Sequence, residues 1–290
     1  MTKITLLDGG MGQELVHRAG DRPTPLWSTQ VMVDHPGMVA SVHRDFAAAG
    51  ATVATTNTYA IHHDRLDGTA LEGKFKELHR LALVEARGFS RVAGSIGPLG
   101  ASYRADLMPI HDDAVAKFAE VACILGSHVD LIICETVVSL AQTRAILEAV
   151  QNVGKPIWIA FSVSDGDGTM LRSGEALADA MTLISVAEAV MVNCSTPEVI
   201  IAALDVLATF DKPYGAYANG FESITDGFLE VNSTVDQLKM RRDFTPDLYA
   251  DYAMRWVDHG ATIIGGCCEV SPAHIAEIAS RLTDAGHTII

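Results

Sequence analysis

Short apolar runs alternate with longer amphipathic segments along the whole chain. Short continuous apolar runs are typical of strands buried on both faces, whereas apolar residues spaced three to four apart are typical of helices that cover such strands. The predicted strands are residues 4–8, 52–57, 91–96, 130–134, 157–163, 189–193, 214–218 and 261–265. The predicted helices are residues 36–49, 71–89, 112–127, 139–153, 175–186, 197–209, 246–259 and 272–285.

Eight strands, each followed by a helix, are the element count of a (β/α)8 barrel, and 290 residues suit one such domain. A doubly wound open sheet has the same alternation and is the alternative. Because the count matches the barrel and no low-complexity linker interrupts the chain, we expect a single barrel domain over residues 1–290. Residues 219–245 are too long for an ordinary connection, and we expect them to lie over one end of the barrel.

Composition and charge narrow the class of protein. Hydrophobic residues make up 49% of the chain, but charged residues, glycine or proline interrupt every window long enough to span a membrane. A net charge of −15 argues against nucleic acid or an anionic membrane as a partner. The N-terminal stretch MTKITLLDGG lacks the long apolar run of a secretory signal. Five cysteines, an odd number, do not suggest a disulfide framework and point to a reducing compartment and to metal or catalytic roles. We therefore expect a cytoplasmic globular protein of the size of an enzyme.

Polar and sulfur-bearing residues follow most of the predicted strands. In a (β/α)8 barrel the catalytic residues lie at the carboxyl ends of the strands, where the loops to the helices begin. After strands 1, 2, 4, 6, 7 and 8 the chain reads Asp8-Gly9-Gly10, Asn57-Thr58-Tyr59, Cys134-Glu135-Thr136, Asn193-Cys194, Asn219-Gly220 and Gly265-Gly266-Cys267-Cys268. Three cysteines, those after strands 6 and 8, are therefore expected at one mouth of the barrel.

Cys194, Cys267 and Cys268 form a candidate metal site. Adjacent residues on a regular strand face opposite sides, but Gly265 and Gly266 allow backbone angles that would let the two neighbouring thiols converge. Three thiolates leave one position of a tetrahedral zinc ion open, which is the arrangement of a catalytic site, and all-sulfur ligands favour zinc over magnesium or calcium. Two alternatives stay open: a disulfide between Cys267 and Cys268, and three unconnected buried thiols.

The motifs at the strand ends resemble one known family over the whole chain. DGGMGQEL near the start, NTY, ET, VNCSTPE and the closing GGCCEVSPAHI are similar, in this order, to the homocysteine S-methyltransferase family. The resemblance implies a (β/α)8 barrel that holds one zinc ion through Cys194, Cys267 and Cys268. It also implies that the thiol of homocysteine takes the open position as a thiolate and attacks the methyl group of a positively charged donor, giving methionine.

The other strand-end residues suit an amino-acid substrate. In the family a carboxylate takes the α-ammonium group, and the resemblance assigns this role to Glu135, with Asp8 nearby. Asn193 is a further candidate for the substrate site, and Asn193 and Asn219 are both expected to orient loops near the thiolates, with a purely structural role as the alternative. The alternatives are a solvated acid near a helix start for Glu135 and turn chemistry for Asp8. Backbone amides are candidates for the α-carboxylate, because glycines allow close approach; they belong to Gly9, Gly10 and Met11.

Chain length and one motif indicate the methyl donor. Cobalamin-dependent members of the family carry large extra domains and betaine-using members are usually longer, whereas TPLWST at residues 24–29 resembles the short members that use S-methylmethionine or S-adenosylmethionine. Trp27 and Tyr59 are the candidate aromatic residues that would flank the cationic centre of the donor. The alternatives are a betaine donor and, outside methyl transfer, a redox-responsive zinc-thiolate protein without catalysis or a structural zinc site.

The remaining cysteines and a histidine pair are interpreted as structural. Cys123 falls within a predicted helix and is expected in the core, whereas Cys134 is expected to border the site without joining the metal set. His62 and His63 are assigned to a surface loop. Residues 164–170, SDGDGTM, are expected to form a loop at the mouth of the barrel.

Overall fold

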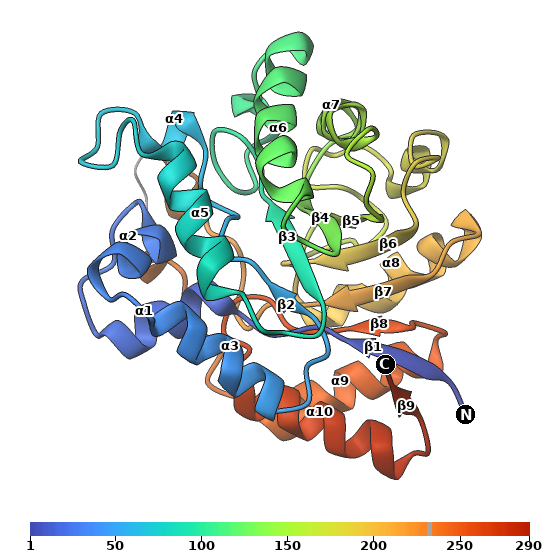
Figure 1. Ribbon diagram of the computed structural model, residues 1–290. Coiled ribbons are helices and arrows are strands. Elements are labelled where there is room, and N and C mark those ends of the chain that lie inside the picture. Colours follow the sequence, from blue (N-terminus) through green and yellow to red (C-terminus); the bar gives the residue numbers. More distant parts are fainter. Residues whose placement is uncertain (231–233) are drawn as a thin grey trace.

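The computed structural model describes residues 1–230 and 234–290, and nine strands in this part of the chain form one parallel sheet (Figure 1). Residues 231–233, which belong to the predicted segment over one end of the barrel, lie outside the described residues. The strands are β1 (Lys3–Leu6), β2 (Ala54–Thr55), β3 (Val92–Ile96), β4 (Leu131–Val137), β5 (Ile157–Phe161), β6 (Ala189–Asn193), β7 (Tyr214–Tyr217), β8 (Ile263–Ile264) and β9 (Thr288–Ile289).

The strand order follows the chain around a closed barrel. The order is β2-β3-β4-β5-β6-β7-β8-β1-β9. On one side β1 pairs with β8, with Thr5 opposite Ile263, and on the other side Leu7 bridges to Val53 just before β2. The short β9, which no sequence pattern predicted, pairs with the first residues of β1. The predicted barrel is confirmed, and the open doubly wound sheet is wrong, because in that fold the strand order reverses part-way.

Helices cover the outside of the barrel (Figure 1). Seven of the eight predicted helices are present, with ends that shift by up to four residues. Side-chain caps explain two of the starts, because Ser139 accepts a hydrogen bond from the amide of Gln142 and Thr245 from that of Leu248. Within the described residues, no helix has the length and apolar character needed to cross a membrane. The helices are α1 (Met11–Ala19), α2 (Trp27–Asp34), α3 (Met38–Ala48), α4 (His63–Leu66), α5 (Phe75–Glu85), α6 (His111–Gly126), α7 (Leu140–Val150), α8 (Ile200–Leu207), α9 (Pro246–Asp258) and α10 (Pro272–Asp284).

The α-helix predicted over residues 175–186 is wrong. In its place the chain forms a short 3-10 helix, Leu177–Thr182. Leu177, Ala180 and Ile184 are buried, whereas Met181 is exposed. The start of the predicted helix is taken up by a short antiparallel pairing, in which Met170 bridges to Ala176 and the amide of Leu171 donates to the carbonyl of Glu175. The spacing of apolar residues three to four apart therefore predicted the buried positions Leu177, Ala180 and Ile184 correctly but predicted the wrong type of helix.

Two helices between β1 and β2, α1 and α2, were not predicted. The first begins after Gly10, whose missing side chain offers no cap. The second buries Ser28 and Thr29 beside Val31 and Met32, so its buried face is half polar and gives no apolar period. Sequence periodicity finds helices through an apolar stripe, which α2 lacks. The short helix α1 does bury an apolar face, with Met11 and Leu15, and was missed although it is amphipathic.

Residues along each strand alternate between two apolar cores. On β4, Leu131 and Ile133 belong to a cluster made only of strand residues and residues that continue strands, which fills the barrel, whereas Ile132 and Cys134 pack against the helices. Because strand side chains alternate with a period of two, Glu135 shares the inward face with Leu131 and Ile133. The inward residues beyond the apolar filling are thus the ones that reach the barrel mouth.

Candidate active site

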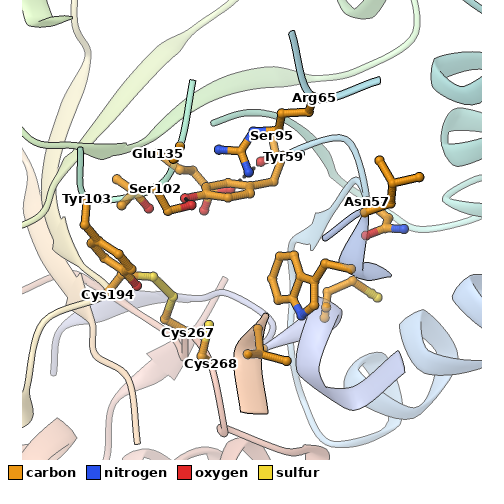
Figure 2. Close-up of a pocket in the computed structure, with 18 of the residues that line it drawn as sticks. Asn57, Tyr59, Arg65, Ser95, Ser102, Tyr103, Glu135, Cys194, Cys267 and Cys268 are labelled. Atoms are coloured by element: carbon orange, nitrogen blue, oxygen red, sulfur yellow. Dashed lines mark hydrogen bonds between the residues drawn. A yellow bond between two sulfur atoms is a disulfide. The ribbon is translucent and has the colours of Figure 1, made fainter. Parts of the chain in front are cut away.

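A cavity of about 510 Å³ opens at the carboxyl ends of the strands. This volume lies within the roughly 300–1,000 Å³ that small-molecule sites occupy. Figure 2 shows its walls, with the cysteines on one side and Tyr59, Ser95 and Glu135 across from them. Every residue predicted from the sequence for the site lines this cavity: Asp8, Gly9, Gly10, Met11, Trp27, Tyr59, Glu135, Asn193, Cys194, Cys267 and Cys268.

The sulfur atoms of Cys194, Cys267 and Cys268 all lie within 4.8 Å of one another. Cys194 and Cys267 form a disulfide, and Cys268 carries a free thiol (Figure 2). The amides of Cys194 and Cys267 donate to the carbonyls of Tyr217 and Ala218, so the two residues flank the end of β7 and face each other there. The predicted alternatives, a disulfide between Cys267 and Cys268 or three unconnected thiols, are therefore wrong.

Gly265 and Gly266 allow close packing around the cysteines rather than unusual backbone angles. Neither has a positive φ, so the predicted reason for these glycines is wrong. A Cβ atom on Gly265 would lie 2.6 Å from the Cβ of Leu7, and one on Gly266 would lie 2.1 Å from a methyl group of Val270. The strained residue is Cys194, whose φ of 48° is left-handed, a conformation that costs a non-glycine residue roughly 1–3 kcal/mol.

The cysteine cluster fits a metal ion once the disulfide is reduced. Around one tetrahedral zinc ion, thiolate sulfurs bound at about 2.3 Å lie about 3.8 Å apart, which is within the 4.8 Å spread of these three. Burial, and less strongly the charge of Glu269, raises the pKa of the Cys268 thiol to about 12. Such a thiol stays protonated at neutral pH unless a cation binds it. The donor set is all sulfur, which soft metals prefer.

Glu135 is a buried carboxylate at the bottom of the cavity. Its two oxygens accept hydrogen bonds from the hydroxyls of Ser95 and Tyr217, the latter at 2.9 Å. Burial raises the pKa of the Glu135 carboxyl, and the two hydroxyl donors partly oppose that rise. A bulge in β4 between Cys134 and Val137 interrupts the regular pairing with β5 at this point, before Val137 pairs with Phe161. The alternative interpretation of Glu135 as a solvated acid is wrong, because only 9% of the residue is exposed.

Asp8 lines the same cavity and also joins β1 to β2. Its carboxylate accepts hydrogen bonds from the amide and the hydroxyl of Thr55, both at 2.7 Å. Burial raises the pKa of Asp8 to about 7, and the charge of Glu135 contributes to that rise. The amides of Gly10 and Met11 already donate to the carbonyls of Val270 and Gly9. The first turn of α1, which has no side-chain cap, adds the positive end of a helix at this place.

Trp27 and Tyr59 meet edge to face on the opposite wall. Their ring centroids are 6.2 Å apart. The indole nitrogen of Trp27 donates to Gln13 at 2.8 Å, and the hydroxyl of Tyr59 bonds to that of Ser102 at 2.9 Å. The guanidinium of Arg65 lies 5.9 Å from the Tyr59 ring centroid. The predicted aromatic pair therefore lies together, each ring held by one hydrogen bond of its polar atom.

The two asparagines predicted to orient loops each bond to backbone. Asn193 exchanges hydrogen bonds with Thr136, whose amide donates to its side-chain oxygen at 3.0 Å, and so connects β6 to the end of β4. Asn219 accepts from the amide of Phe221 at 3.1 Å, which supports the turn after β7. Asn193 lines the cavity, whereas Asn219 is not among the lining residues.

Several residues of the site were not predicted. Ser95 and Tyr217 were within reach of the sequence, because both occupy inward positions of predicted strands and fall at their ends. Tyr103, which also lines the cavity, lies in the irregular loop after β3, where no periodicity marks it. Arg172, in the loop after β5, donates to the carbonyl of Cys194 and was equally unmarked.

Two of the structural interpretations need correction. Cys123 is exposed and not part of the core, because it lies on the outer face of α6. His62 is buried, with a ring nitrogen 3.0 Å from the carbonyl oxygen of Gly97. His63 is exposed, as expected, but begins the helix α4 and does not lie in a loop. Cys134 is buried beneath the helices, outside the thiol cluster.

Comparison with known proteins identifies the family. The sequence model of the family described as "Homocysteine S-methyltransferase" matches residues 5–282. The chain belongs to the homocysteine S-methyltransferase family. It is 32% identical to the homocysteine S-methyltransferase of Escherichia coli, covering 96% of this chain and 95% of that protein. It is 27% identical to the homocysteine S-methyltransferase YbgG of Bacillus subtilis, covering 96% and 94%. The resemblance drawn from the motifs is confirmed.

Solved structures of a homocysteine S-methyltransferase have the same fold. The homocysteine methyltransferase MmuM of Escherichia coli in its metallated form aligns with a TM-score of 0.77 at 28% identity, covering 96% of each chain. Its oxidized form aligns with a TM-score of 0.78 at the same identity and coverage. That protein was solved with a metal, and this chain has three cysteines that could hold a metal ion.

Proposed function

We propose that this chain transfers a methyl group from a sulfonium donor to the thiol of homocysteine, giving methionine, with a zinc ion held by Cys194, Cys267 and Cys268. The observation that carries the proposal is the presence of three converging thiols and a buried carboxylate, Glu135, in one cavity. Bound there, zinc would keep the acceptor sulfur deprotonated at neutral pH. Residues 1–290 would act as one homocysteine-binding domain in the cytoplasm.

Glu135 and Asp8 hold the amino-acid part of homocysteine in this proposal. The hydroxyls of Ser95 and Tyr217 orient the Glu135 carboxylate, and an α-ammonium group beside it would favour the ionised form that burial disfavours. The carboxylate of the substrate then lies toward the uncapped first turn of α1, whose positive end favours an anion. Asn193 keeps the ends of β4 and β6 together.

The donor binds on the aromatic wall. An onium methyl group is attracted to a ring face by roughly 0.5–2 kcal/mol, and Trp27 and Tyr59 offer two rings within one wall of the cavity. Rings do not distinguish a sulfonium from a quaternary ammonium. S-methylmethionine is proposed ahead of S-adenosylmethionine because TPLWST at residues 24–29 resembles members of the family that use these sulfonium donors. Betaine is the alternative donor.

A donor panel with the zinc-loaded, reduced protein tests the proposal. We expect about one zinc per chain, and methionine formation from homocysteine with S-methylmethionine, more slowly with S-adenosylmethionine. Methionine formation with betaine and with neither sulfonium compound would contradict the proposed donor but not the proposed role of the zinc-bound thiolate. Stoichiometric zinc without methyl transfer from any donor would favour the redox-responsive zinc-thiolate protein instead. Selenocysteine should be included as an acceptor, because a selenocysteine Se-methyltransferase of Brassica oleracea var. italica is 24% identical over 96% of this chain.

A further inference from the structure

The backbone turns sharply at Cys194. Its amide donates to the carbonyl of Tyr217 at 3.2 Å, which continues the pairing of β6 with β7. Its left-handed φ of 48° then directs the carbonyl away from that pairing, toward the loop after β5. A non-glycine residue keeps such a conformation only where its surroundings hold it. The position of the Cys194 sulfur therefore depends on what holds this carbonyl.

Arg172 and Ser162 hold the carbonyl of Cys194. The Nη2 of Arg172 donates to it at 3.1 Å and the hydroxyl of Ser162 at 3.2 Å. The Nε of Arg172 in turn donates to the Ser162 oxygen at 2.8 Å, so the two donors support each other. The Arg172 side chain is only 11% exposed, which strengthens these charge-assisted hydrogen bonds.

Asp165 fixes the other edge of the guanidinium. Its carboxylate accepts from Arg172 through both oxygens, at 2.8 and 3.2 Å, and its side chain is 17% exposed. The same carboxylate accepts from the amides of Thr196 and Ile224, at 3.2 and 3.3 Å. Thr196 follows Cys194 by two residues, so Asp165 holds the chain after the cysteine while Arg172 holds the cysteine itself.

Tyr103 covers the face of the guanidinium. The Cζ of Arg172 lies 4.8 Å from the ring centroid of Tyr103, within the range of a cation–π contact. The Tyr103 ring lies beside Cys194 in the wall of the cavity (Figure 2). The planar guanidinium of Arg172 thus contacts three groups: the carbonyl of Cys194, the carboxylate of Asp165 and the ring of Tyr103. A lysine ammonium cannot make this set of contacts, because it has neither the planar fork nor the stacking face.

We propose that Arg172 is a positioning residue for the metal site: it holds Cys194 in its left-handed turn and Tyr103 beside it, so that the Cys194 thiolate points to the metal. This inference rests on the proposed zinc-dependent function. Groups that orient metal ligands without touching the metal typically change metal affinity by about 10–100-fold when they are replaced.

The test compares Arg172→Lys with Arg281→Lys in the reduced protein. Arg281, on α10, also pairs with several acids, namely Asp247, Asp251 and Glu277, but lies outside the cavity. We expect zinc affinity, measured by chelator competition, to fall by about 10–100-fold in Arg172→Lys and to stay unchanged in Arg281→Lys. In the cobalt-substituted Arg172→Lys protein the thiolate-to-cobalt absorption band should weaken and shift. The metal-free unfolding midpoint should fall no further than in Arg281→Lys, which excludes a general loss of folding.

Asp165→Asn keeps the inference testable if Arg172→Lys does not fold. The amide preserves the shape of Asp165 and removes the charge that orients the guanidinium, so the same loss of affinity is expected at about tenfold. Zinc affinity within about twofold of the wild type in the folded variants, with an unchanged cobalt band, would overturn the inference. Wild-type zinc binding and methyl transfer are measured in the same series. A wild type without either would contradict the proposed function, whereas an active wild type with unaffected variants would contradict only the role of Arg172.

Discussion

The two walls of the cavity are built in different ways. The thiol wall consists of Cys194, which follows β6 directly, and of Cys267 and Cys268, which follow β8 after two glycines. Backbone hydrogen bonds to β7 and its continuation hold all three. The aromatic wall consists of Trp27 and Tyr59, which stand on the connections after β1 and β2, whereas Tyr103, on the connection after β3, lies beside Cys194.

The difference indicates that the two walls have different roles in substrate binding. Strand pairing repeats with a regular register, so residues at strand ends inherit accurate positions, as metal ligands require. The thiol wall adds to its strand pairing the hydrogen bonds of Arg172 and Ser162 to the Cys194 carbonyl. The rings of Trp27 and Tyr59 lie on irregular connections and are held by side-chain contacts, with Gln13 and Ser102. Connections of this kind tolerate substitution better than strands. We therefore expect the thiol wall to determine the acceptor chemistry and the aromatic wall to determine the donor.

The largest effect is expected from removing a thiol. Replacing Cys194, Cys267 or Cys268 by alanine should remove most of the bound zinc and lower methyl transfer by more than about 100-fold, because losing a ligand exceeds the effect of losing a group that orients one. Zinc content and activity are measured on the same samples. Cys123→Ala is the control, because Cys123 is exposed and remote from the cavity. Full zinc retention in all three variants would end the claim that this wall binds the metal.

Oxidation should inactivate the enzyme reversibly through the same wall. Cys194 and Cys267 pair in the structure, so oxidants should join these two residues and release zinc. Peptide mapping identifies the pair, and recovery should need both a thiol reductant and zinc. Inactivation with zinc still bound would show that the metal site is not the oxidised element.

Replacing the buried acid on the inward face of β4 should affect the acceptor alone. Glu135→Gln should raise the KM for homocysteine by roughly a hundredfold, because it removes a charged partner of the ammonium group worth a few kcal/mol, while zinc content stays the same. Glu85→Gln is the matched control: Glu85 is equally buried and accepts two backbone hydrogen bonds, but lies on α5 outside the cavity. An unchanged KM for homocysteine in Glu135→Gln would exclude this residue from the substrate site.

The smallest effect is expected on the aromatic wall. Trp27→Ala should raise the KM for the donor by about 2- to 30-fold, corresponding to roughly 0.5–2 kcal/mol for a ring–cation contact. The KM for homocysteine should change less, and zinc content should not change. Tyr252→Ala, which removes a ring from the outer helix α9, controls for general loss of an aromatic side chain. An equal rise in both KM values would mean that the two walls do not divide donor from acceptor.

Much of this molecule could be predicted from the order of residues. Apolar runs located the eight barrel strands, since a parallel sheet covered by helices needs strands that are apolar on both faces. The residues directly after those strands included the cysteines, Glu135 and Asp8, because strands of a barrel all end at one mouth. Ser95 and Tyr217 were also accessible, as inward positions with a period of two.

Other features depended on contacts between distant segments. Cys194 pairs with Cys267 rather than Cys267 with Cys268 because both flank the end of β7, which local sequence does not state. The helix predicted at residues 175–186 is replaced by a short 3-10 helix, because Ala176 pairs with Met170 in the preceding loop and leaves less chain for a helix.

Arg172 is a residue whose role could not be predicted from the sequence and is decided by tertiary contacts. Nothing in its neighbours along the chain distinguishes it from a surface arginine. Its meaning arises only where Asp165, Ser162, Tyr103 and the carbonyl of Cys194 surround it. Periodicity encodes which residues are buried and where strands end, because those depend on the residue and its neighbours. The partners of a charged side chain in an irregular loop depend on how several loops meet, and only the folded chain decides that.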